Sequence, residues 1–280
     1  MLWAVLAALG AASLFAVGAA VQHQEANAVE EGSHASLLIR LAKRPLWLLG
    51  IVADGGAIAL QAVAFGFGSV PLVQALLVSG LPLAALLSAA LQRRRMRGDE
   101  VLGTLLCAPG IALLAPALSA DPSDVDPSRS DAVVAGIVVA LVVLPLLALR
   151  ARRHGGLYAG TAAGIVTGAG SVLLAVIAAR FPHWSELFGS WATYVGLVVG
   201  VLGLLLAQIA FQTGDIGAPL ASLTITEPVV ATVLAVAVLK DHLPHSAGAV
   251  AAAVAGAALS VAGVLVLSRQ PADDVSSAAS

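Results

Sequence analysis

The amino-acid sequence predicts an all-α polytopic membrane protein, and three observations carry that prediction. Of the 280 residues, 59% are hydrophobic, and only 11% are charged, against roughly 25% in an average soluble domain. The apolar residues gather into runs of about 20, the length of helix that crosses a bilayer. Polar turns separate the runs. This composition excludes a soluble globular domain, and it shows no basic footprint for nucleic acid.

We expect about nine transmembrane helices from these runs. The first run follows Met1 without a basic region or a clear cleavage site, so it is expected to be a true span and not a signal peptide. The expected spans are residues 2–22, 46–67, 70–91, 100–118, 132–150, 157–178, 191–212, 216–239 and 246–267.

Residues 24–44 interrupt this pattern. Glu25, Glu30 and Glu31 precede a short apolar patch that begins at Leu37, so the segment cannot span comfortably. Its apolar face beside basic residues is typical of a helix lying in the inner interface of the membrane. An ordered cytoplasmic loop is the alternative.

An internal repeat relates the two halves at one constant offset. In the order of the spans, 157–178 then corresponds to residues 24–44, so this interfacial segment is expected to replace one crossing in an N-terminal repeat over residues 1–118. An external loop over 119–131 and a five-helix repeat over 132–268 follow. Such repeats are common in secondary transporters. The matching pairs are Phe65 with Phe211, Pro82 with Pro228, Ala85 with Ala231 and Gly110 with Gly256.

The basic residues predict an orientation in the membrane. With the N-terminus outside, Arg129, Arg180 and Lys240 are the only basic residues on the outer side. All others then lie on the cytoplasmic side, as the positive-inside rule requires. The C-terminus is therefore expected inside, with a flexible cytoplasmic tail over 269–280. We expect a multi-pass protein of the cell (plasma) membrane.

Glu227 is the most conspicuous residue, because it lies in the middle of the apolar span 216–239. A carboxyl at bilayer depth is expensive, and such residues usually face a bundle interior and mark a substrate, ion or proton path. Pro228 follows it, and a proline removes one helix hydrogen bond and frees carbonyls that can line a cavity. We expect a helix break at Pro228 and at its repeat partner Pro82. A structural carboxyl is the alternative for Glu227.

Two stretches resemble known transporters. From Phe211 to Leu267, a small-residue turn, a mid-helix proline, the helix end Lys240-Asp241 and a Gly/Ala-rich last helix resemble the drug/metabolite transporter (EamA-like) superfamily. The N-terminal half resembles its NIPA-type magnesium transporter branch, and the residues that carry this likeness are Ser13-Leu14-Phe15-Ala16-Val17-Gly18, Pro45-Leu46-Trp47-Leu48-Leu49-Gly50 and Ala64-Phe65-Gly66-Phe67-Gly68. The resemblance implies a transporter fold, with Mg²⁺ as one expected cargo.

The chain departs from the NIPA pattern at its Gly-Glu pair, which falls on Ala57-Ile58. Asp54, one turn earlier, is a candidate replacement on roughly the same face. Mg²⁺ prefers oxygen ligands and keeps several waters, so Asp54 and Glu227 are the candidate metal contacts. The other polar residues of the expected path are Gln61, Gln74, Gln208, Thr224 and Thr226, for which hydrogen bonding between helices is the alternative role.

These observations predict a secondary transporter that moves a small solute by alternating access through a midplane cavity containing Glu227. A NIPA-type magnesium transporter is the second hypothesis, and a non-transporting membrane scaffold is the third. We expect no enzyme activity and no cofactor, because neither a nucleotide-binding motif nor a catalytic motif occurs. The expected partners are the lipid bilayer, a small solute or cation, and a second copy of the chain in a homodimer.

Overall fold

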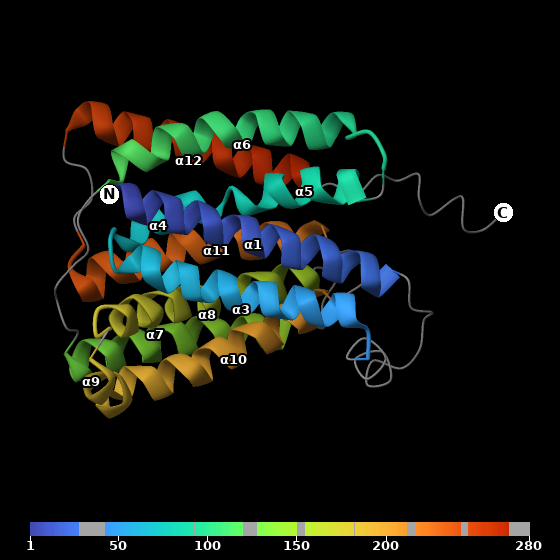
Figure 1. Ribbon diagram of the computed structural model, residues 1–280. Helices are drawn as coiled ribbons and strands as arrows, with labels where there is room; N and C mark the ends of the chain where they lie inside the picture. Colours follow the sequence, from blue (N-terminus) through green and yellow to red (C-terminus); the bar gives the residue numbers. More distant parts are fainter. Residues whose placement is uncertain are drawn as a thin grey trace. The chain divides into compact units, whose positions relative to one another are not determined.

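A computed structural model describes residues 1–27, 43–91, 93–119, 128–149, 155–181, 183–211, 217–241 and 246–268 (Figure 1). These residues form helices joined by turns, and no strand occurs among them. The helices are α1 (Leu2–Asn27), α3 (Pro45–Phe65), α4 (Val70–Leu77), α5 (Gly80–Leu91), α6 (Gly98–Ala117), α7 (Arg129–Leu149), α8 (Gly155–Ala178), α9 (Trp184–Gly189), α10 (Trp191–Phe211), α11 (Gly217–Leu234), the π-helix η1 (Ala235–Leu239) and α12 (Ala247–Leu267).

The chain is a multi-pass helical membrane protein. Within the described residues, 8 helical spans are long and apolar enough to cross a membrane, and α10 adds the apolar stretch Trp191–Ala207. The expected spans agree closely with these helices except at α1, which continues beyond residue 22 to Asn27. The interfacial helix expected over 24–44 falls mostly on residues 28–42, which lie outside the described part, as do 120–127 of the external loop and the tail.

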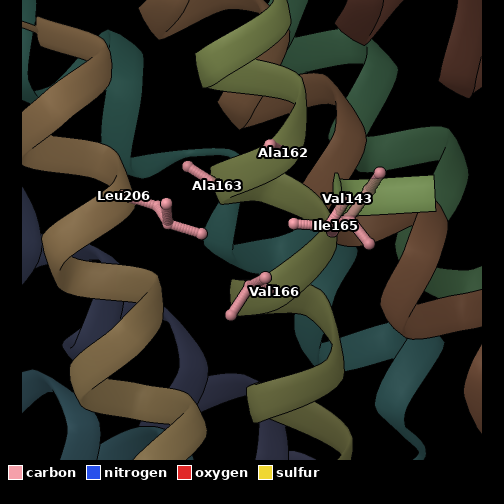
Figure 2. Packing of buried hydrophobic residues seen from close by; sticks show 6 residues of the cluster. All are labelled: Val143, Ala162, Ala163, Ile165, Val166 and Leu206. Atoms are coloured by element: carbon pink, nitrogen blue, oxygen red, sulfur yellow. The ribbon is translucent and has the colours of Figure 1, made fainter. Parts of the chain in front are cut away.

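The helices form two compact units. Unit 1 contains α1, α3, α4, α5, α6 and most of α12, and unit 2 contains α7 to α11 with η1. In unit 1, α1 packs along α3, α4 and α5. In unit 2, α8 is central and packs against α7, α10 and α11. The apolar core of unit 2 therefore lies around α8, and Figure 2 shows Val143 of α7 and Leu206 of α10 on opposite sides of Ala162, Ala163, Ile165 and Val166.

The helix contacts indicate that α1 has the same position in unit 1 as α8 has in unit 2. Just as α8 contacts α10 and α11, α1 contacts α3 and the α4–α5 pair. The sequence instead paired α8 with residues 24–44, but the constant offset places α8 over residues 9–32, most of which belong to α1. The offset is not exact for α1, because residues 28–44 separate α1 from α3, whereas the shorter segment 179–190 separates α8 from α10. The extra residues shift the offset for α1 relative to the helices that follow it.

Two glycines bring α6 and α12 into backbone contact within unit 1. A Cβ on Gly110 would stand 2.8 Å from Gly256 O, and a Cβ on Gly256 would stand 2.7 Å from Gly110 O. Gly110 also faces Ser260, and Gly256 faces Leu114, so the helices run antiparallel. In the repeat, Gly110 corresponds to Gly256 and Leu114 to Ser260. Each contact is therefore the reciprocal of the other, as a local two-fold axis requires, and this arrangement supports the predicted repeat.

The two repeat-related prolines have different effects on the backbone. At Pro82, the span divides into α4 and α5 at residues 78 and 79, one turn upstream, where the proline ring and missing N–H act. The weak helix formers Ser79 and Gly80 assist this division. The break expected at Pro228 is wrong, because α11 is continuous from Gly217 to Leu234. Close packing of α11 against α8 on both sides of Pro228 holds it in the helical conformation.

Replacing Gly256 by alanine tests the α6–α12 contact. Because the new Cβ would meet the Gly110 carbonyl oxygen and Leu114, we expect a loss of about 1–3 kcal/mol of stability from overpacking. Thermal unfolding in detergent measures it. Gly248→Ala on the same helix is the matched control, because nothing lies within 4 Å of its Cβ position. Equal melting temperatures for the two variants would contradict the contact.

Candidate functional site

A stripe of glycines on α8 determines where α11 lies. Gly160, Gly164 and Gly168 recur every four residues and therefore share one helix face. A Cβ on Gly164 would stand 2.9 Å from Leu223 O, and one on Gly168 would stand 2.7 Å from Glu227 O. The helices thus run parallel with their backbones almost touching, which is the role of small residues between membrane helices.

This contact brings Glu227 to a hydroxyl group of α8. Ser171 Oγ donates a hydrogen bond to Glu227 Oε1 at 3.4 Å. Thr167 lies one turn earlier, but its hydroxyl donates to its own backbone, to Ala163 O at 3.0 Å and Gly164 O at 3.2 Å, and Gly203 of α10 leaves room for its methyl group. Ser171 is buried and Glu227 is half-buried. The result is a carboxyl group that accepts a hydrogen bond from a hydroxyl inside a helical unit.

No Lys or Arg side chain among the described residues forms an ion pair with Glu227. Two ion pairs of that part of the chain lie elsewhere, between Arg94 and Glu100 and between Arg97 and Asp99. A carboxyl inside a membrane bundle without a basic partner can be neutralised by a proton or by a bound cation. This group is therefore chemically able to exchange one or the other.

Sequence reasoning missed Thr167 and Ser171. The sequence contains a signal for them, because each lies three residues after a glycine of the α8 stripe. Thr167 follows Gly164, and Ser171 follows Gly168. Residues three and four apart share a helix face. The face of α8 that packs closely against α11 therefore also carries the hydroxyl groups. This could have been inferred from the sequence once α11 was chosen as the partner helix.

The other predicted residues of unit 2 lie less directly at the carboxyl. Thr226 packs against Gly164, where a Cβ would stand 2.8 Å from the Thr226 Cβ, so it contributes to helix contact. Thr224 is half-buried on α11. Gln208 belongs to α10, and its side chain lies outside the described part of the structure.

Asp54 lies in unit 1, where α3 faces α1. A Cβ on Gly18 would overlap the Asp54 carboxylate and stand 3.1 Å from Gly50 O. Gly18 therefore makes room for the carboxylate between the helices. Gln61 follows two turns later on α3, which places it on the same face, and it is only 5% exposed. This supports the expectation that Gln61 and Asp54 share one face of the helix.

Gln74 is the most enclosed polar candidate. It lies on α4, about one turn before the α4–α5 division, and it is 2% exposed. Its Nε2 has no hydrogen-bond partner in the described structure. A buried donor without an acceptor costs roughly 1–3 kcal/mol. The Gln74 amide can therefore donate a hydrogen bond to an acceptor group of a bound ligand. While no acceptor is bound, the unpaired donor lowers the stability of the protein.

The structure brings Glu227 together with Ser171, and Asp54 together with Gly18. Asp54, Gln61 and Gln74 belong to unit 1, whereas Glu227 belongs to unit 2. Within the described ranges, no group of three or more His, Cys, Asp or Glu side chains could hold a metal ion. Any cation bound at Glu227 would therefore need oxygen ligands from hydroxyls, backbone carbonyls or water.

The fold and this site define the chain as a multi-pass helical membrane protein with a carboxyl group inside a helix bundle. It is 30% identical over 247 residues to an uncharacterized protein of Corynebacterium glutamicum, and the alignment covers 86% of each chain. The chain therefore belongs to the same family as that corynebacterial protein. No family model matches the sequence, and no solved structure matches it.

Gln74→Met tests whether the enclosed amide is unpaired, and so available to a ligand, or is hydrogen-bonded within the protein. Methionine has a similar volume and no donor, so we expect it to raise the melting temperature of the ligand-free protein, by the equivalent of about 1–3 kcal/mol. A lower melting temperature would mean that the amide is bonded within the protein. Gln61→Met, at the buried amide of α3, is the comparison variant.

Proposed function

We propose that the chain is a secondary transporter of the drug/metabolite transporter superfamily, which moves a small solute across the plasma membrane by alternating access. Glu227 is the group that binds the solute or its coupling ion. The observation that carries this proposal is the hydrogen bond from the Ser171 hydroxyl of α8 to the Glu227 carboxyl, without a basic partner among the described residues.

The helix contact explains why the site suits exchange. The backbone of Glu227 is held in place by packing against α8, because Gly168 allows α8 to approach the Glu227 carbonyl oxygen. Ser171 then holds the carboxyl by a hydrogen bond of 3.4 Å, which is long for a bond between oxygen atoms. A weakly held carboxyl on a firmly held backbone can release one ligand and accept another without moving the helices apart.

The internal repeat supports the same proposal. Secondary transporters commonly contain inverted repeats, with the binding site near the midplane of the membrane. The antiparallel, reciprocal contact of α6 with α12 is the contact that an inverted repeat produces. The orientation with the N-terminus outside and the C-terminus inside is part of the proposal, and it follows from the distribution of basic residues.

Flux measurements with the purified protein in vesicles test the proposal. Glu227→Gln retains the size of the side chain and removes its charge, so we expect coupled flux to fall to the level of empty vesicles. Ser171→Ala removes one hydrogen bond, and we expect about fivefold weaker apparent affinity for the coupling ion, as a bond of about 1 kcal/mol implies.

Thr161→Ala is the matched control on the same helix, because Thr161 Oγ1 bonds its own backbone at Leu157 O, at 2.8 Å. It should leave flux unchanged. Mg²⁺ belongs among the first solutes assayed, in view of the NIPA-type resemblance, and saturable Mg²⁺ uptake that falls in Asp54→Asn would identify the cargo. Wild-type flux in Glu227→Gln would contradict the proposal and favour a membrane scaffold.

A further inference from the structure

The turn between α5 and α6 has an unusual backbone at its first basic residue. After α5 ends at Leu91, the N–H groups of Arg93 and Arg94 bond back to Ala90 O at 3.1 Å and Ala89 O at 3.0 Å. Arg93 adopts the left-handed conformation, with φ of 51°. This is a helix C-cap in which glycine is the usual residue, because a Cβ is unfavourable there.

A clasp of ion pairs holds the rest of the turn. Arg94 forms two parallel hydrogen bonds to Glu100, each of 2.7 Å. Glu100 also accepts the Arg97 backbone N–H at 2.8 Å, and Arg97 pairs with Asp99 at 3.2 Å. Glu100 raises the pKa of Arg94 through this bond. The charges of Arg94 and Arg97 are thereby neutralised within the turn.

Arg93 and Arg95 remain as two exposed cations. Neither has an ion-pair partner among the described residues, and both side chains are exposed. The clasp fixes the backbone on both sides of them, since Arg94 lies between the two. The turn therefore presents two adjacent positive charges on a rigid support.

We propose that Arg93 and Arg95 bind the phosphate groups of anionic phospholipids. The turn joins two apolar spans, Val70–Leu91 and Gly98–Ala117, so it lies at the depth of the lipid headgroups. Guanidinium groups bind phosphate by paired hydrogen bonds, and the cytoplasmic leaflet, on which the basic residues place this turn, carries the anionic lipids. An arginine at a position that favours glycine indicates that its side chain is required for more than closing the turn.

Arg93→Gly provides a test in which folding is not at risk, because glycine suits the left-handed backbone. Titrating detergent-solubilised protein with phosphatidylglycerol, and measuring bound lipid by native mass spectrometry, gives the affinity. We expect about fivefold weaker binding for Arg93→Gly and about 25-fold for Arg93→Gly with Arg95→Gln, as the usual contribution of one basic residue implies. The melting temperature without lipid should not fall.

Two controls make the outcome specific. Lys240→Gln removes one cation from a residue whose backbone is also left-handed, with φ of 60°, but which lies at the end of η1 in unit 2. This variant should bind phosphatidylglycerol like the wild type. Phosphatidylcholine and inorganic phosphate should not bind with comparable affinity. Unchanged phosphatidylglycerol affinity in the double variant would overturn the proposal, as would an equal loss in Lys240→Gln. Competition by millimolar inorganic phosphate would assign the arginines to free phosphate instead.

Discussion

The backbone contact between α8 and α11 is the interaction on which the candidate site depends. Three glycines at helical spacing remove the side chains that would keep these helices apart, and a Cβ on Gly168 would already stand 2.7 Å from Glu227 O. Without that approach, Ser171 could not reach the Glu227 carboxyl. In a membrane, where burial of apolar side chains gives helices little reason to associate, such packing and a few polar contacts must hold the bundle. The same glycines thus serve both stability and the site.

The two repeats share a helix plan without sharing their acidic residues. Glu227 corresponds to Leu81 in the repeat, and Asp54 corresponds to Gly200. Gly200 lies on α10 with nothing within 4 Å of its Cβ position. The α6–α12 contact is reciprocal, whereas each carboxyl belongs to one repeat alone. The chemistry of the protein is therefore asymmetric on a nearly symmetric scaffold.

The helices could be predicted from the sequence because apolar run length is a direct consequence of bilayer thickness. The behaviour of the prolines could not, since it depends on neighbours. Pro82 follows Ser79 and Gly80 and interrupts its span, while Pro228 lies in α11, which packs on both sides of it against α8. Glu227 was recognisable from its cost in an apolar span, but its hydroxyl partner Ser171 belongs to another helix, 56 residues earlier in the chain. In a sequence rich in Ala, Gly and Leu, few residues indicate which helices pack against each other.

Access of water to residue 227 is the most direct test of a transport role for this position. Cys107 is the single cysteine of the chain, so Glu227→Cys in a Cys107→Ala background carries one thiol. In oriented vesicles, a membrane-impermeant thiol reagent applied to either side reports whether that thiol meets water. An alternating-access site predicts labelling from both sides, slowed by a bound solute. A thiol that stays unlabelled from both sides, while the denatured protein labels fully, would show a dry core and contradict the account.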